Sequence, residues 1–281
     1  MAYHRIYKYT SVARPLSPRS TVTRAVLMLL PAAALLGAVA SWAAGDPAMQ
    51  IVQRALQFLL IAYGSWALAR ELNPDDLVFA FFSLALGLLI ALAVNAPGLL
   101  IVYATLLLVR LVNRSSGLTA KTSDSLIALG LVLIVMYATE SPFFGAVAAV
   151  AFILDGSLRD PHRQQWIFGL VCLAATVVYM VDHDVGFSAL SAPDSLAEWL
   201  AVLVLLIFAL NILLLRRVRS KGDAYGKALD AGRVRGGMLV GLLAAVQGIM
   251  RPDSVIVIVA VIAGICVGMA FRKGFKAPAT G

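Results

Sequence analysis

Apolar residues recur along the whole chain in stretches of roughly 13–21 residues, separated by short polar segments. Stretches of this kind suit α-helices that cross the apolar part of a bilayer. The pattern predicts an all-α, polytopic membrane protein with about ten transmembrane helices. We place these helices at 25–44, 52–69, 77–95, 98–112, 124–139, 143–155, 166–181, 195–215, 237–250 and 254–271.

The remaining segments define the expected domain organisation. Residues 25–271 form a single transmembrane domain, interrupted by a long loop at 216–237. Residues 1–24 form a basic N-terminal arm, and residues 272–281 form a short basic tail. The first apolar stretch is too long for the core of a cleavable signal peptide, so we expect it to remain as a helix.

Positive charge is distributed asymmetrically about these helices. All but two of the 23 Lys and Arg residues fall on the side that carries both termini, and the exceptions are Arg54 and Arg251. Lys and Arg in short loops mark the cytoplasmic side of a membrane. The asymmetry therefore predicts cytoplasmic termini in the inner (plasma) membrane. It also requires an even number of spans, which agrees with ten.

Every connection expected on the opposite side contains a proline at or near the start of the returning helix. These prolines are Pro47, Pro97, Pro142, Pro193 and Pro252. One interpretation is a set of five helical hairpins that arose by duplication. The alternative is that proline is tolerated at the first position of any helix, because its missing N–H has no helical partner there.

Small residues one turn apart predict where two helices approach closely. Gly237 and Gly241 lie in the ninth stretch, and Gly264 and Gly268 lie in the tenth. Such pairs allow close contact of helix backbones in lipid. We therefore expect the ninth and tenth helices to pack tightly against each other.

Composition supports the membrane class and argues against several chemistries. The chain is 61% hydrophobic and 14% charged, with mean hydropathy +0.89, whereas soluble domains carry roughly 25% charged residues. The net charge of +8 follows from the one-sided loops, so no nucleic-acid partner is expected. Cys172 and Cys266 lie within helices, and the three histidines lie in separate segments. We therefore expect no metal site and no cofactor.

Polar side chains within the apolar stretches are candidates for a solute path. They include Asn211, Gln247, Tyr103 and Tyr137. A carboxamide in hydrocarbon needs a partner, which makes Asn211 and Gln247 the most informative. The alternative is that they form ordinary hydrogen bonds between helices. Ionisable residues fall toward the ends of the stretches, which argues against ion coupling through a buried carboxylate.

The cytoplasmic loops carry two groups of candidates. Arg114, Lys121, Arg159 and Arg163 are suited to a phosphate or a lipid headgroup. Asp75, Asp76, Asp124 and Asp155 could form a carboxylate cluster that binds Mg²⁺. The alternative is that the acids cap helix N-termini and the cations contact anionic headgroups.

Two basic segments are candidates for contacts outside the chain. Residues 216–237 combine seven basic residues with several glycines, and their middle, 223–230, is expected to form a short helix on the membrane. Residues 1–24 combine tyrosines with five cations. Both segments suit anionic lipid headgroups, or a protein partner.

Three function classes remain. A small permease or flippase-type transporter of a small or amphipathic solute suits ten compact helices best. A non-catalytic subunit of a larger membrane complex, docking through 216–237 and 1–24, is the alternative. A membrane enzyme acting on a phospho- or polyprenyl-phosphate lipid is third. The chain has no P-loop, zinc-protease or nucleophile-elbow motif, so no catalytic residue is assigned.

Overall fold

The computed structural model describes residues 5–16, 20–93, 98–186, 193–224, 226–250 and 252–274, without the side chains of 248–256 and 272–274. These residues form one short 3-10 helix, η1 (Arg5–Lys8), and ten α-helices, which confirms the all-α prediction. The α-helices are α1 (Thr21–Ala43), α2 (Ala48–Leu72), α3 (Phe79–Ala93), α4 (Leu99–Asn113), α5 (Thr122–Ala138), α6 (Pro142–Ser157), α7 (Gln165–Asp182), α8 (Leu196–Leu214), α9 (Ala231–Met250) and α10 (Pro252–Gly274).

Helices α1, α2, α7 and α8 are long and apolar enough to cross a membrane. Four further apolar helices have 15–17 residues, and the described part of α10 adds another such segment. Large apolar side chains cover the outer faces of the bundle, among them Leu35, Trp42, Val181 and Leu213, which are 66%, 71%, 79% and 76% exposed. A surface of this kind is suited to lipid rather than water.

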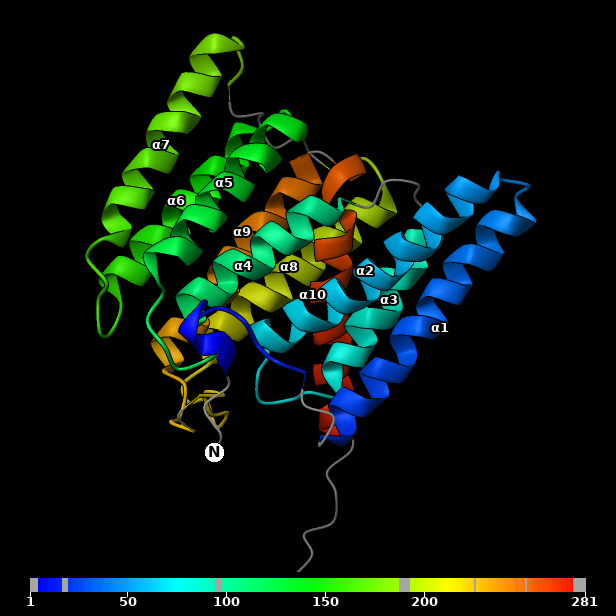
Figure 1. Ribbon diagram of the computed structural model, residues 1–281, viewed down its shortest axis with the longest axis horizontal. Helices are drawn as coiled ribbons and strands as arrows, with labels where there is room; N and C mark the ends of the chain where they lie inside the picture. The colour runs from blue at the N-terminus through cyan, green and yellow to red at the C-terminus, as the bar shows by residue number, and fades with distance from the viewer. Residues whose placement is uncertain are drawn as a thin grey trace, which may run out of the picture.

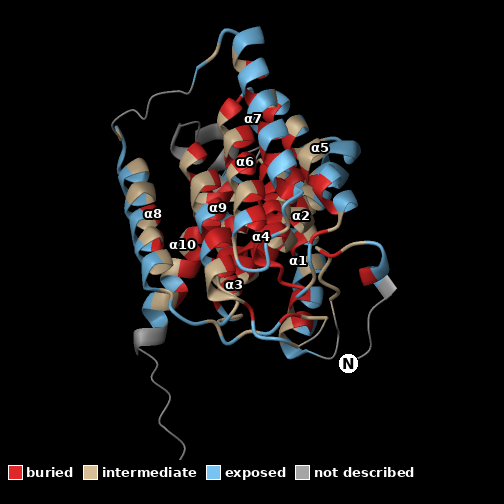
Figure 2. Cartoon of the chain, turned by 90° about the vertical axis from the view of Figure 1, so that its left-hand side faces the viewer, coloured by how far each residue is buried: buried red, intermediate tan, exposed pale blue. Residues whose placement is uncertain are grey.

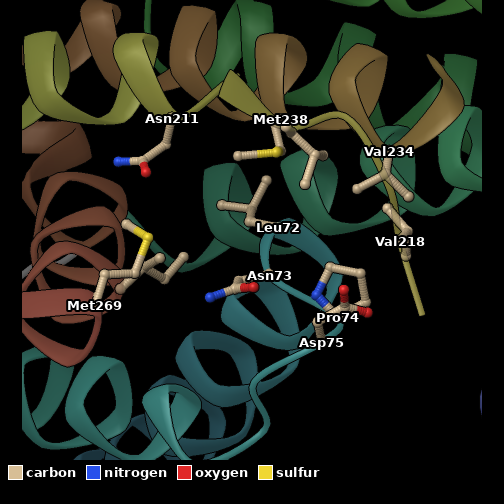
Figure 3. A pocket seen from close by; sticks show the side chains of 11 residues that line it. Leu72, Asn73, Pro74, Asp75, Asn211, Val218, Val234, Met238 and Met269 are labelled. Carbon is tan, nitrogen blue, oxygen red and sulfur yellow. The ribbon is translucent and has the colours of Figure 1, made fainter. Parts of the chain in front are cut away.

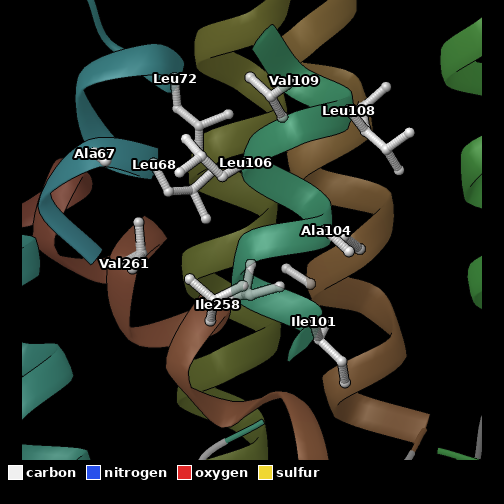
Figure 4. Packing of buried hydrophobic residues seen from close by; sticks show 14 of the residues in the cluster. Ala67, Leu68, Leu72, Ile101, Ala104, Leu106, Leu108, Val109, Ile258 and Val261 are labelled. Atoms are coloured by element: carbon white, nitrogen blue, oxygen red, sulfur yellow. The ribbon is translucent and has the colours of Figure 1, made fainter. Parts of the chain in front are cut away.

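Helices α2, α4, α9 and α10 form the centre of the bundle (Figure 1). Leu68 of α2, Leu108 of α4 and Ile258 of α10 are fully buried there, in one continuous apolar cluster (Figure 4). Helices α1 and α3 cover one side of this centre, and α5, α6 and α7 cover the other. Helix α8 lies against α9 and α10 with its outer face exposed (Figure 2).

The prediction of five hairpins is only partly correct. Consecutive helices pack against each other in the pairs α1–α2, α5–α6 and α9–α10. Among the described residues, α3 does not contact α4, and α7 does not contact α8. Helix α3 packs instead on α10 and α2, and α7 packs on α6. The predicted turn prolines Pro97 and Pro193 connect these separated helices; Pro97, like Arg251 and residues 275–281, lies outside the described residues.

The reason for this difference is close packing at small residues. A Cβ atom at Gly264 of α10 would overlap the backbone of Ser83 in α3, so these two helices are in direct backbone contact. Helices α9 and α10 pack against each other as predicted, but the nearest neighbours of their Gly pairs lie in other helices. Their partners are Asn113 for Gly237, Leu72 for Gly241, Ser83 for Gly264 and Phe79 for Gly268.

The long loop is shorter than predicted, and its described residues do not form the expected surface helix. Helix α9 begins at Ala231, where Asp230 Oδ1 accepts a hydrogen bond from the backbone N–H of Arg233 at 3.0 Å. Residues 215–230, which we call the 215–230 segment, instead fold back as a tight turn in which the N–H of Gly222 bonds the carbonyl of Lys227 at 2.8 Å. Gly226 has φ +64°, a conformation that ends helices rather than extending them.

Candidate functional site

One end of the bundle carries most of the buried charge, and we call it the basic end. It contains the arm, the end of α2, the end of α4, the end of α6 and the 215–230 segment, at the bottom of Figure 1. Arg14, Glu71, Arg114, Asp155 and Arg233 all lie there with side chains no more than 9% exposed. Charges removed from water need partners, so their pairing defines this end.

The first ion cluster joins the arm to three other segments. Arg14 donates to Asp223 from Nε at 2.6 Å and from Nη2 at 2.9 Å, and its Nη1 lies 3.3 Å from Glu71 Oε1. Arg110 Nε donates to the same Glu71 oxygen at 3.1 Å. Burial acts to lower the pKa of Arg14, but the carboxylates of Glu71 and Asp223 outweigh it and raise that pKa above its ordinary value. The arm is therefore part of the folded structure.

The second ion cluster joins α4, α6 and α9. Asp155 Oδ1 accepts hydrogen bonds from Arg233 Nη1 at 2.6 Å and from Arg114 Nε at 2.9 Å. Other donors of the two guanidinium groups reach backbone carbonyls: Arg233 bonds Arg159 O at 2.6 and 2.9 Å, and Arg114 Nη1 bonds Asp160 O at 2.9 Å. Arg114 Nη2 is buried without a partner among the described residues. The two cations share a single carboxylate, and the partial negative charges of these carbonyl oxygens add hydrogen-bond acceptors for their other donors.

The four cations predicted to bind phosphate are dispersed in the structure. Arg114 is in the second ion cluster, and Lys121 donates its Nζ to the carbonyls of Tyr7 and Lys8 at 2.9 and 2.5 Å. Arg159 is 77% exposed and lies 3.6 Å from Asp230, while Arg163 is exposed. Two of the four are thus engaged within the protein and two face outward.

The four predicted carboxylates are also separate. Asp75 accepts the backbone N–H groups of Arg219 and Ser220, at 3.0 and 2.8 Å. Asp124 accepts the backbone N–H and the hydroxyl of Ser11, at 2.8 and 2.6 Å. Asp155 belongs to the second ion cluster and Asp76 is partly buried at the start of α3. In the part of the chain that the structure describes, no three acid, His or Cys side chains are placed to share a metal ion.

The four solute-path candidates occupy different places. Tyr103 donates its hydroxyl to Leu60 O at 2.9 Å. Tyr137 is 55% exposed, with its ring centroid 4.9 Å from that of Tyr179. Gln247 is 1% exposed, and neither atom of its amide has a partner among the described residues. Asn211 donates from its side-chain nitrogen to Ile207 O of its own helix at 2.8 Å, and among the described residues its amide shows no hydrogen bond to another helix.

Asn211 differs from the other three because it borders two cavities. The first is an apolar groove of about 480 Å³ between α8 and α10, lined by Val204, Ile207, Cys266 and Met269 among others. The second is a pocket of about 70 Å³ at the basic end, which reaches Asn73 and Asp75. Asn211 and Met269 line both cavities, so the two meet at these side chains (Figure 3).

Helix α8 forms one wall of the groove and is the least embedded of the four long helices. In the most apolar 18-residue segment of α8, 11% of the residues are buried. Helix α8 contacts α9 and α10. Trp199, Leu203, Leu206 and Leu210 are 53–63% exposed on its outer faces. The groove therefore lies beside an exposed apolar face of the bundle.

Comparison with known proteins adds no relative: no protein-family model matches the chain, and neither a curated protein sequence nor a solved structure matches it. The functional interpretation therefore depends on the geometry of the chain itself.

Sequence reasoning missed several residues of the basic end. Arg14, Glu71, Arg110 and Arg233 are central to the two ion clusters, yet none was singled out as a site residue. A signal was present for Glu71, which is an acid directly beside Arg70 at the end of an apolar stretch. An acid in that position needs a buried cation, but the sequence does not show which one.

Proposed function

We propose that the protein is a flippase-type transporter of an amphipathic solute. The observation that carries this proposal is the meeting of the α8–α10 groove with the basic-end pocket at Asn211. The groove offers an apolar path open to lipid, and the pocket offers polar groups from Asn73 and Asp75 next to it. A lipid-like molecule has the same division between an apolar and a polar part.

The arrangement of polar groups supports facilitated movement without ion coupling. The buried ionic groups described above lie at the basic end and are paired with each other or with carbonyls. The polar side chain at the junction of the groove is the neutral amide of Asn211. Proton- and ion-coupled carriers ordinarily use an ionisable side chain inside the membrane. We therefore propose that the solute moves down its own gradient.

We propose a location in the inner (plasma) membrane, with the basic end on the cytoplasmic side. Lys and Arg gather at this end, as the positive-inside rule requires. Ten membrane-crossing helices would then place both termini in the cytoplasm. In this orientation the Asn211 junction lies in the cytoplasmic half of the bilayer, close to the headgroups.

Reconstitution tests the proposal directly. The purified chain is inserted into vesicles that contain fluorescent NBD-phosphatidylethanolamine or NBD-phosphatidylglycerol in both leaflets, and dithionite is added outside. We expect the wild type to bring inner-leaflet label to the outside. Asn211→Leu should slow this exchange about tenfold or more, because it removes the polar group at the junction. Leu213→Ala, at an α8 position that is 76% exposed, is the matched control and should exchange at the wild-type rate. Exchange equal to that of protein-free vesicles would reject the flippase proposal.

One observation favours the subunit hypothesis as a second candidate. Arg216, Arg217 and Arg219 are exposed on the 215–230 segment, which is itself ordered by its bonds to Asp75. A rigid cationic loop is a suitable docking site for an acidic protein surface. Purification in mild detergent tests it: a partner in stoichiometric amount, lost in Arg216→Glu with Arg217→Glu, would support docking.

A further inference from the structure

A third cavity lies at the basic end, away from the α8–α10 groove. It has a volume of about 430 Å³ and lies between the arm, the start of α1, the end of α2 and the 215–230 segment. Its walls include Ser20, Thr23, Trp66, Arg70, Lys221 and Asp223. None of these residues lines the groove or the Asn211 pocket. The cavity is therefore a separate place, at the level where lipid headgroups would lie in the proposed orientation.

Arg70 is the less exposed of the two cations that line this cavity. Its side chain is 17% exposed, and its guanidinium lies 3.8 Å from Asp223, at the long end of the range for an ion pair. The two oxygens of Asp223 are already occupied by Arg14, at 2.6 and 2.9 Å. Among the described residues Arg70 makes no hydrogen bond through its guanidinium, which packs over the Trp66 ring at 5.4 Å from its centroid. Its donors are thus available to a ligand.

The charges around the cavity do not balance. The first ion cluster and Arg70 together bring three guanidinium groups, from Arg14, Arg70 and Arg110. They face two carboxylates, those of Glu71 and Asp223. A partly buried excess of one positive charge is stabilised when an anion occupies the adjacent space. Lys221 lines the same cavity and adds a further cation.

A helix N-terminus also borders this cavity. Helix α1 begins at the cavity with Ser20 as its N-cap, whose side chain makes no capping bond, and no acid lies in its first turn. The first N–H groups of this 23-residue helix, at its positive end, therefore have no side-chain acceptor among the described residues of the N-cap and first turn.

We propose that this cavity binds a phosphate mono- or diester, with Arg70 and Lys221 as the charged contacts and the α1 N-terminus as the neutral donor. Guanidinium groups and helix N-termini are the usual partners of phosphate oxygens. The apolar side chains of Val22 and Leu77 lie in the same wall and suit the carbon atoms attached to the phosphate. The phosphate belongs either to a lipid headgroup or to a water-soluble phosphorylated compound.

Native mass spectrometry of the full chain in detergent tests the site. Phosphatidylglycerol is added to the wild type and to Arg70→Gln. The lipid concentration at which half of the protein carries one lipid molecule is then compared between the two. Loss of a charge-assisted contact should weaken that binding about tenfold or more. Arg159→Gln is the matched control, because Arg159 is a cation of the same end that is 77% exposed and does not line the cavity. Equal weakening in both variants, or in neither, would overturn the proposal.

Lys221→Gln provides a second test that leaves the buried pairs intact, because the Lys221 side chain is exposed. Lys221→Gln should also lower the affinity for the first phosphatidylglycerol molecule, by a smaller factor than Arg70→Gln. Unchanged affinity in both variants would overturn the proposal, even if one of them folds poorly. Pyrophosphate distinguishes the sources. Displacement of the lipid by pyrophosphate would support a soluble phosphorylated ligand, and retention of the lipid would support a headgroup.

Discussion

Arg14 and Asp223 are 209 positions apart in the chain and are joined by two hydrogen bonds, from Nε at 2.6 Å and Nη2 at 2.9 Å. This pair connects the N-terminal arm to the 215–230 segment. Because Arg14 also reaches Glu71, the pair fixes both segments to the end of α2. The basic end is therefore closed by segments that come from opposite parts of the sequence.

Arg14→Ala should release the 215–230 segment. Asp223 would lose two charge-assisted hydrogen bonds, whereas Glu71 would keep Arg110. We expect trypsin to cleave within 216–221 about tenfold faster, which corresponds to roughly 1.4 kcal/mol of local stabilisation. Lys8→Ala, at an exposed arm position, is the control and should leave the cleavage rate unchanged. Equal rates for Arg14→Ala and the wild type would show that the arm does not hold the segment.

Asp155→Asn should destabilise the whole bundle. The change leaves Arg114 and Arg233 buried without a neutralising charge, and breaking a buried ion pair in this way typically removes about 3–5 kcal/mol. Arg159→Ala removes the exposed pair with Asp230 and should change stability by about 1 kcal/mol or less. Thermal unfolding of the purified variants in detergent measures both. Similar melting temperatures for the two would contradict the importance of the second ion cluster.

Gly264→Ala should weaken the contact of α3 with α10. The added Cβ would meet the backbone of Ser83, which cannot move without shifting a helix. Gly130 in α5 has no atom within 4 Å of the same position, so Gly130→Ala should stabilise the protein by about 0.5–1 kcal/mol through helix propensity. The two variants should therefore shift the melting temperature in opposite directions. A rise for both would mean that α3 and α10 are not in close contact.

The helices could be predicted from the sequence because each helix in lipid needs its own apolar stretch. Ten helices were expected and ten α-helices are present among the described residues, with most ends within a few residues of the prediction. Four of them are long and apolar enough to cross a membrane. Their partners could not be predicted, because contacts between apolar helices in lipid depend on shape and leave no repeating pattern. The Gly264 and Gly268 pair correctly indicated a close contact between two helices, but these glycines contact α3 and not α9.

The site was predictable to a smaller extent. Asn211 could be singled out as a carboxamide within an apolar stretch. The groove beside it depends on how α8 packs against α10, which the sequence does not show. Arg70 and Trp66 gave no signal, because an Arg at a helix end and a Trp in a span both have ordinary explanations. Only the folded chain places them beside the start of α1.

The proposed orientation can be tested with single cysteines after replacement of Cys172 and Cys266. Ser157→Cys lies exposed at the basic end, and Asp182→Cys lies exposed at the opposite end of the neighbouring helix. In intact cells we expect a membrane-impermeant maleimide to label Asp182→Cys within minutes and Ser157→Cys only after permeabilisation. The reverse order would mean that the basic end faces outward, against the positive-inside rule.

The most direct test of the proposed transport path is a reversible cross-link across the groove. Cys266 Sγ of α10 lies 3.8 Å from the backbone carbonyl oxygen of Val204 in α8, and both residues line the groove, so Val204→Cys adds a second thiol across the groove from Cys266 in a background that lacks Cys172. The exchange of NBD-phosphatidylethanolamine is then measured in one vesicle sample, before oxidation, after oxidation and after reduction. The account predicts that the disulfide forms, that exchange falls at least about tenfold while it is closed, and that exchange returns on reduction. An unchanged rate in protein shown to be cross-linked would contradict movement of the solute between α8 and α10.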